Sequence, residues 1–158
     1  MSHYHRLQVA SVLPETRDAV AVSFAVPAEL APAFAFLPGQ HLNLRAQVAG
    51  CGELRRSYSI CAAAGEPLRV AIKRQPGGLF SNWANDHLRA GDWLEAMPPT
   101  GLFHAGLEPS AAHRYLAVAA GSGITPVLSL IKSTLAAEAR SQFTLFYGNR
   151  ASSSIMFR

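Results

Sequence analysis

The chain has 158 residues, of which 49% are hydrophobic and 15% are charged, and its formal net charge is +4. This composition is typical of a globular protein with a real core and argues against global disorder. No window approaches the roughly 18 uninterrupted apolar residues of a membrane-spanning helix. The opening MSHYHRLQVASVL lacks the long apolar run of a signal peptide, so we expect neither export nor a membrane partner.

The charged residues and the cysteines further narrow the kinds of ligand and site that this protein could have. Lys73 and Lys132 are the only lysines, so arginine supplies most of the positive charge and suits planar recognition of phosphates or carboxylates. The arginines are scattered rather than gathered in an aromatic-rich basic patch, which disfavours a nucleic-acid partner. Cys51 and Cys61 are the only cysteines, and the six histidines show no metal-ligand spacing. We expect two free thiols in a reducing cytoplasm and no metal site.

Short alternating or valine-rich segments fill the first hundred residues and predict strands. These segments are Leu7–Val12, Ala19–Val26, His41–Val48, Leu54–Cys61, Leu68–Arg74 and Trp93–Met97. Between the last two, Leu79, Trp83 and Leu88 fall near helical spacing, and Gly91 is a helix stop signal. The pattern predicts a small six-stranded antiparallel barrel with one helix.

From about residue 113 the pattern changes. The run YLAVAAGSGITPVLSLIKSTLAAEARSQFTLFYGNR indicates an apolar strand, a glycine-rich turn, an amphipathic helix and a second apolar strand at Phe143–Tyr147. Uninterrupted apolar strands suit a parallel sheet covered on both faces. We place the domain boundary within 104–113, which gives domains 1–106 and 107–158, and we expect another helix to start near the C-terminus. Because two strands and one crossover make no stable parallel sheet, we expect the second domain to be truncated.

The segment RRSYSI combines guanidinium, phenol and hydroxyl groups within one predicted strand. Side chains two residues apart share a face, so Arg56 and Tyr58 lie together, with Arg55 and Ser57 opposite. Ser59 would reach a ligand bound by Arg56 and Tyr58 only at a bulge or a strand end. A guanidinium beside a stacking phenol suits a nucleotide that carries an aromatic ring. The alternative is a cross-strand ion pair with a packing tyrosine.

Two glycine-rich turns each precede a predicted helix. In GSGITP, Gly121 and Gly123 let the backbone approach an anion at a helix N-terminus, and Pro126 fits the first helical turn. Pro126 also stands where the dinucleotide fingerprint G-x-G-x-x-G has its third glycine. In GGLFS, Ser81 is expected to cap the helix. Each turn alone is equally compatible with an ordinary connection to a helix.

Taken in order, RSYS, VAIKR, GGLFS, PPTGLF and GSGITP resemble the ferredoxin–NADP reductase superfamily over nearly the whole chain. Within it, ETRDAVAVSFAVP and FTLFYGNRASSSIMFR are similar to the reductase components of phenylacetyl-CoA epoxidase (phenylacetate-CoA oxygenase) systems. The resemblance implies a six-stranded antiparallel FAD-binding barrel, followed by the first βαβ half-unit of a nicotinamide-nucleotide-binding parallel-sheet domain. It also implies an iron–sulfur cluster, in a C-terminal part that these residues lack.

The resemblance also implies roles for individual residues. Arg56 would pair with the FAD pyrophosphate, Tyr58 would stack on the isoalloxazine ring, and Ser59 would hydrogen-bond near the flavin N5 atom. Tyr58 and Ser59 would therefore act at the reacting ring, whereas Arg55 matches no family position and is expected to be solvated. The other implied residues are Ala71, Ile72 and Lys73 along the ribityl and adenine side through backbone contacts, Gly78, Leu79, Phe80 and Ser81 around the pyrophosphate, Thr125 at the flavin edge, and Gly121, Ser122 and Gly123 against the nicotinamide nucleotide.

Arg150 follows the second apolar strand, in the region where dinucleotide folds discriminate the ribose 2′ group. An arginine there accommodates a 2′-phosphate. We therefore prefer NADPH to NADH as the donor, with a solvated arginine at a helix start as the alternative.

The function that follows is that of an FAD-dependent NAD(P)H reductase. A hydride would move from the nicotinamide to the flavin, and electrons would pass singly to an iron–sulfur centre and on to oxygenase subunits for phenylacetyl-CoA ring epoxidation. One alternative is an FAD-binding fragment or assembly module without reductase activity, and another is a different flavin reductase of the same superfamily. A nucleic-acid-binding barrel is disfavoured by the ordered flavin motifs.

Overall fold

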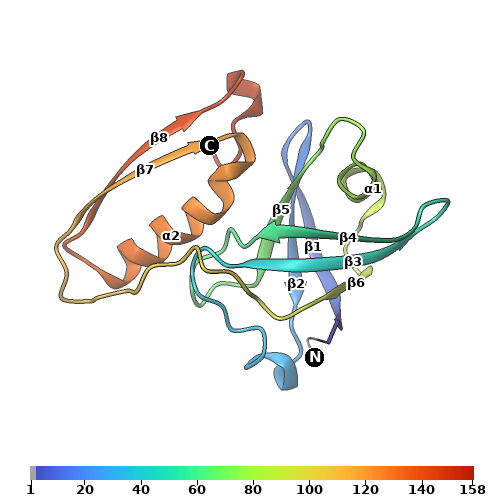
Figure 1. The fold of residues 1–158 in the computed structure, drawn as a ribbon, viewed down its shortest axis with the longest axis horizontal. Coiled ribbons are helices and arrows are strands. Elements are labelled where there is room, and N and C mark those ends of the chain that lie inside the picture. Colours follow the sequence, from blue (N-terminus) through green and yellow to red (C-terminus); the bar gives the residue numbers. More distant parts are fainter. Residues whose placement is uncertain (1–2) are drawn as a thin grey trace.

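The computed structural model describes residues 3–158 (Figure 1). The first part holds β1 (His5–Thr16), β2 (Ala19–Ala25), β3 (His41–Val48), β4 (Gly52–Ser59), β5 (Arg69–Lys73), α1 (Leu79–His87) and β6 (Trp93–Ala96). The second holds β7 (Arg114–Ala120), α2 (Ile124–Ala137) and β8 (Gln142–Gly148). Met1 and Ser2, which open the stretch interpreted as lacking a signal peptide, lie outside the described residues. No helix within residues 3–158 has the length and apolar character to cross a bilayer.

The first part is one antiparallel sheet with the strand order β4-β3-β6-β1-β2-β5. Its two ends approach each other just past β4, where Ile60 forms a bridge with Val70 and the Cys61 N–H donates to the Arg69 carbonyl at 2.9 Å. Figure 1 shows β3 and β4 crossing over the other strands of this strongly curled sheet. The predicted six-stranded antiparallel architecture is therefore confirmed.

The inside of the curled sheet holds the main core. Alternation along β3 leaves Leu42 and Leu44 with no exposed surface, and Leu7 and Leu94 join them from β1 and β6. Burying one such side chain stabilises the fold by roughly 1.5–3 kcal/mol. The core therefore fixes β3, and with it the register of the neighbouring strand β4.

Helix α1 covers one end of this core, and its presence confirms the helix predicted from the spacing of Leu79, Trp83 and Leu88. Phe80, Ala84 and Leu88 are buried at a spacing of four residues, while Leu79 is 52% exposed. Phe80 lies against Tyr58 at a ring-centroid distance of 5.7 Å.

In the second part, β7 and β8 pair in parallel and α2 makes the crossover, which confirms the predicted half-unit. Figure 1 shows α2 between these strands and the first part. On the other face, Leu116 and Val118 are 68% and 73% exposed within the described residues. Where another helix was expected to start near the C-terminus, Ser152–Ser154 form a short 3-10 helix, and Met156 beyond it is completely buried in a small core. The predicted domain boundary within 104–113 lies between β6 and β7 and stays a prediction.

Side chains of α2 hold the two parts together. The Ser129 hydroxyl donates to the Ala62 carbonyl at 2.6 Å, and the Ser133 hydroxyl accepts from the Ala64 N–H at 3.0 Å. Ser129 and Ser133 are 0% and 3% exposed. This contact fixes the start of α2 relative to the end of β4, and the candidate site lies between those two points.

Candidate functional site

Two neighbouring cavities lie where the two parts meet. The first cavity, of about 470 Å³, is bounded by the end of β4, by β5, and by the first turns of α1 and α2. The second cavity, of about 810 Å³, reaches from the turn after β5 to the segment after β8. Lys73, Gln75 and Ser122 line both cavities, so they form a common boundary.

Most of the predicted site residues meet at these cavities. Those lining the first cavity are Arg56, Tyr58, Ser59, Lys73, Gly78, Phe80, Ser81, Ser122, Gly123 and Thr125. Gly121 and Arg150 line the second cavity. Ile72 and Leu79 line neither, because Ile72 has no exposed surface and Leu79 faces solvent. A backbone role for either residue stays a prediction.

Strand β4 separates its two arginines as the alternation predicts. Opposite β3, Arg56 pairs with Leu44 and Tyr58 with Leu42, so both share the side of the buried leucines. Arg56 donates to the Arg55 carbonyl at 2.6 Å, and within residues 3–158 no carboxylate lies at ion-pair distance from its guanidinium. Arg56 therefore brings an uncompensated positive charge to the first cavity.

Arg55 differs from its neighbour in both partner and position. Its guanidinium binds the Glu53 carboxylate at 2.5 Å and its side chain is 60% exposed. It lines neither cavity. Its charge is therefore already neutralised at the surface, away from the candidate site.

Tyr58 and Ser59 end β4 inside the first cavity. Burial raises the pKa of the Tyr58 phenol to about 12, although the Arg56 charge opposes the shift, so the phenol is neutral near pH 7. Tyr58 packs against Phe80 with an angle of 39° between the rings. Ser59 is the last residue of β4, and this strand end lets it line the same cavity as Tyr58.

The first turns of α1 and α2 both line the first cavity. Gly78 and Gly123 are the N-cap residues of α1 and α2, and neither helix has a side-chain cap. The predicted capping role of Ser81 was therefore wrong. Its hydroxyl instead accepts from the Gln75 N–H at 3.0 Å, because Ser81 lies inside the first turn. Free N–H groups at the start of α1 make an anion-binding environment, whereas at α2 the Ile124 N–H already donates to the Gly121 and Ser122 carbonyls and Pro126 has no N–H.

The glycine turn before α2 is fixed by local hydrogen bonds. Thr125 is buried and its hydroxyl donates to the Ser122 carbonyl at 3.0 Å. The Tyr147 hydroxyl donates to the Gly121 carbonyl at 2.9 Å, while Gly121 adopts a left-handed φ of 50° that favours glycine. Pro126 lies in the first turn of α2, as predicted.

Sequence reasoning missed several polar residues at the cavities. Gln75 lines both, and Asn149 lines the second, where the two amide atoms of its side chain are buried without a partner among the described residues. The signal for Asn149 was its position between Gly148 and Arg150 at a strand end. No local signal marks Gln75, because its position depends on the turn that follows β5.

The cysteines are both free, as predicted, with Cys51 exposed and Cys61 buried. Burial raises the pKa of the Cys61 thiol to about 11, so it is protonated near pH 7. Cys61 belongs to the small core between the two parts and takes no part in the candidate site.

Two family models match the chain. The oxidoreductase FAD-binding domain matches residues 6–105, and the oxidoreductase NAD-binding domain matches residues 117–158. Both matches agree with the two parts of the fold.

Curated and solved proteins are similar over almost the whole chain. A 1,2-phenylacetyl-CoA epoxidase component from Escherichia coli K12 is 54% identical, over 100% of this chain and 44% of the relative. The ferredoxin reductase component of 3-ketosteroid-9-alpha-monooxygenase from Rhodococcus rhodochrous is 39% identical, over 96% and 42%. This chain thus spans less than half the length of these relatives. The structure of phthalate dioxygenase reductase matches with a TM-score of 0.80 and 32% identity, over 98% of this chain and 46% of that chain.

Proposed function

We propose that this chain, which belongs to the oxidoreductase FAD-binding domain family, holds FAD in the first cavity and a nicotinamide nucleotide in the second. On this proposal it forms the flavin-binding part of an NAD(P)H-dependent reductase. The carrying observation is that an unpaired guanidinium, a half-buried phenol and the uncapped start of α1 converge on one cavity.

The residues of the first cavity suit the separate chemical parts of FAD. Arg56 and the N–H groups at the start of α1 suit a pyrophosphate, which needs positive charge and hydrogen-bond donors. Tyr58, backed by Phe80, offers an aromatic surface for a flat ring. Gly78 lines this cavity at the start of α1, where the turn is tight enough that a Cβ would lie 2.7 Å from the Ser81 hydroxyl oxygen.

The chain supplies position and electrostatics for the reaction. When bound, FAD would supply the hydride-accepting and single-electron chemistry, while the residues of this chain would hold and cover its ring. Tyr58 covers one side of the ring and, with its high pKa, adds no negative charge near pH 7. Ser59 and Thr125 approach the cavity from β4 and α2, so they would hold the two rings from opposite parts of the fold.

The second cavity suits a phosphorylated nucleotide. Arg150 and Gly121 contribute a guanidinium and a glycine turn to its lining. An arginine just past the second strand accommodates a ribose 2′-phosphate, so NADPH is the preferred donor.

The names of the relatives support the partners. One is a component of phenylacetyl-CoA epoxidase and another is the ferredoxin reductase component of a monooxygenase. The full reductase would therefore pass electrons through an iron–sulfur centre outside these residues to oxygenase subunits, in phenylacetyl-CoA epoxidation. Two free thiols suit a cytoplasmic setting.

The alternative is a fragment that binds FAD but cannot reduce it, which is favoured by the coverage of only 44% of the relative.

Anaerobic addition of NADPH to the FAD-loaded chain tests the proposal. Bleaching of the flavin absorbance is expected, and it should be faster with NADPH than with NADH. The variant Arg150→Ala should narrow that difference, while Arg17→Ala, which changes an exposed arginine outside both cavities, should preserve it. A yellow chain that does not bleach would support the fragment alternative, and a chain that takes up no FAD would contradict the proposal.

A further inference from the structure

A short stretch of backbone separates the two cavities. We call Lys73–Gly78 the wall segment: Lys73 and Gln75 line both cavities, Pro76 lines the second, and Gly78 lines the first. The Gly78 N–H donates to the Gln75 carbonyl at 2.8 Å, which closes a four-residue turn. Pro76 takes the second position, and Gly77 takes the third with a φ of 69°, as a type II turn requires.

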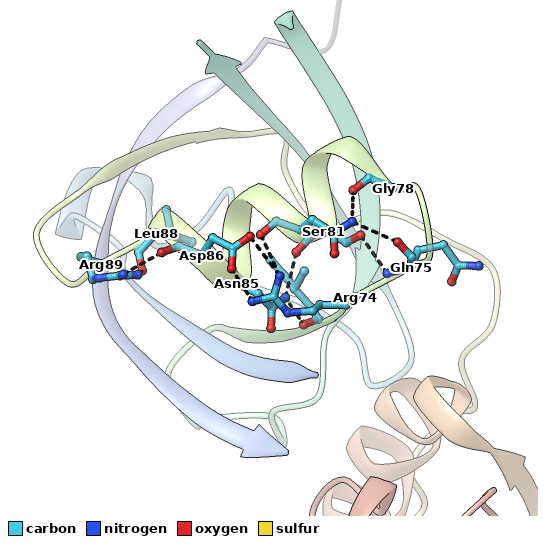
Figure 2. Close-up of polar contacts among 10 residues, drawn as sticks. Arg74, Gln75, Gly78, Ser81, Asn85, Asp86, Leu88 and Arg89 are labelled. Carbon is cyan, nitrogen blue, oxygen red and sulfur yellow. Dashed lines mark hydrogen bonds and ion pairs between the residues drawn. The ribbon is translucent and has the colours of Figure 1, made fainter. Parts of the chain in front are cut away.

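Side chains of α1 hold this turn (Figure 2), and one of them, Asn82, also lines the second cavity. The Asn82 side-chain amide donates to the Gln75 carbonyl at 3.2 Å and to the Gly78 carbonyl at 2.8 Å. The Ser81 hydroxyl accepts from the Gln75 N–H at 3.0 Å. Both ends of the turn are therefore fixed by two neighbouring residues of the same helix.

An ion pair holds the wall segment farther along α1. Arg74 binds the Asp86 carboxylate through two contacts, of 3.0 and 2.5 Å, and also donates to the Asn82 carbonyl at 3.4 Å. Figure 2 shows Arg74 extended along the helix toward Asp86. The Arg74 charge is thereby neutralised by protein, whereas Arg56 keeps its charge for the first cavity.

Asn85 also binds two backbone carbonyls through its side-chain amide, but outside the wall segment. Its side-chain amide donates to the Ile72 carbonyl at 3.0 Å and to the Ser81 carbonyl at 2.8 Å. Ile72 lines neither cavity. Asn82 and Asn85 therefore each use one amide to bind two carbonyls, but only Asn82 holds the turn that lies between the cavities.

We propose that Asn82 is a positioning residue, which preforms the wall segment for the flavin dinucleotide. This inference rests on the proposed function, because it assigns the ligand of the first cavity to FAD. Asn82 acts through the Gln75 and Gly78 carbonyls, which leaves the N–H groups at the start of α1 free for an anion. A wall that is already ordered spares the ligand the entropic cost of ordering it, so it raises affinity.

The variants Asn82→Ala and Asn85→Ala form a matched test, because each removes two amide–carbonyl hydrogen bonds from α1. Denaturant unfolding of the apo chain should show similar losses of stability. Titration of each folded apo variant with FAD should show that Asn82→Ala weakens binding roughly tenfold, the equivalent of two ordinary hydrogen bonds. Asn85→Ala should retain FAD affinity. Hydrogen exchange at the Gly78 amide should accelerate only in Asn82→Ala.

The variant Asn82→Leu keeps roughly the size of the side chain and removes its N–H donors without adding a charge, so it should weaken FAD binding about as much. This variant also tests the positioning role of Asn82 if the Asn82→Ala variant does not fold. Equal FAD affinities of the Asn82 and Asn85 variants would overturn the positioning role of Asn82. Failure of the unaltered chain to bind FAD would instead overturn the proposed function.

Discussion

Arg55 and Arg56 are adjacent and chemically identical, yet β4 gives them different electrostatic surroundings. Arg55 is bound by Glu53 at the surface, whereas Arg56 enters the first cavity without a carboxylate partner among the described residues. Because a strand alternates its faces, neighbouring residues in β4 are directed to opposite sides of the sheet. Although they are adjacent, Arg55 therefore forms an ion pair at the surface, whereas Arg56 is a candidate to bind a ligand in the first cavity.

At this scale we predict that Arg56→Ala reduces FAD retention far more than Arg55→Ala. Losing one or two charge-assisted hydrogen bonds to a pyrophosphate should weaken binding by about ten- to a hundredfold. The flavin-to-protein ratio of the purified variants, followed by titration with FAD, measures the effect. Equal flavin content in both variants would show that the two arginines do not divide their roles in this way.

Individual residues were predictable from sequence only where local periodicity decides their position. Alternation in RRSYSI indicated which arginine shares a face with Tyr58, and the structure places both in the first cavity. Ser81 was misread because GGLFS does not reveal which residue begins the helix. Gln75 was missed because its contacts depend on how the turn after β5 folds back on α1.

The elements are joined by a few buried polar contacts as well as by the core. At the end of α2, Glu138 is 1% exposed and accepts from the Ser141 hydroxyl at 2.6 Å and the Tyr115 hydroxyl at 3.0 Å. It also accepts from the Glu108 N–H at 3.1 Å. One carboxylate therefore ties α2 to β7 and to the connection from the first part.

Glu138 should make stability depend on pH. The Ser141 hydroxyl and then the Glu108 N–H hold the pKa of the Glu138 carboxyl below its ordinary value of 4.5, so the folded state favours the ionised form. Its contribution is full above that value and is lost as pH falls through the lower folded pKa. Unfolding in denaturant should therefore show Glu138→Gln clearly less stable than the unaltered chain at pH 7, with the gap narrowing in acid. A gap independent of pH would contradict this role.

Helix α1 shows why an element can be predicted while its orientation cannot. The spacing of apolar residues predicted a helix but did not decide which of them are buried. In the fold, Phe80 is buried and Leu79 is 52% exposed. The buried face depends on tertiary contacts, such as that of Phe80 with Tyr58, which local spacing does not reveal.

At the scale of the molecule, hydroxyl groups as well as a small apolar core hold α2 against the first part. Thr125, Ser129 and Ser133 lie four residues apart and are all buried. Sequence alone suggests a polar, solvent-facing side for such a stripe. Only the packed fold shows that Ser129 and Ser133 bind the backbone of Ala62 and Ala64, whereas alternation and apolar runs were enough to predict the six strands and the half-unit.

Removal of one of these hydroxyls should weaken the whole fold. Ser129→Ala takes the hydroxyl donor away from the Ala62 carbonyl at a completely buried position, which should cost about 1–3 kcal/mol. Ser153→Ala, at an exposed serine, should cost almost nothing. The free energy of unfolding in denaturant measures both variants, and equal values for the two would mean that the Ser129 contact contributes no stability.

The boundary that Lys73, Gln75 and Ser122 share between the two cavities has a thermodynamic consequence. A ligand in either cavity restricts the freedom of residues that also face the other one. The two occupancies are then linked, and the factor by which the first ligand changes the dissociation constant of the second must equal the factor in the reverse direction. Titration of a nicotinamide dinucleotide into the FAD-loaded and the FAD-free chain gives the ratio of its two dissociation constants. The dissociation constant of FAD should change by the same ratio when the dinucleotide is bound.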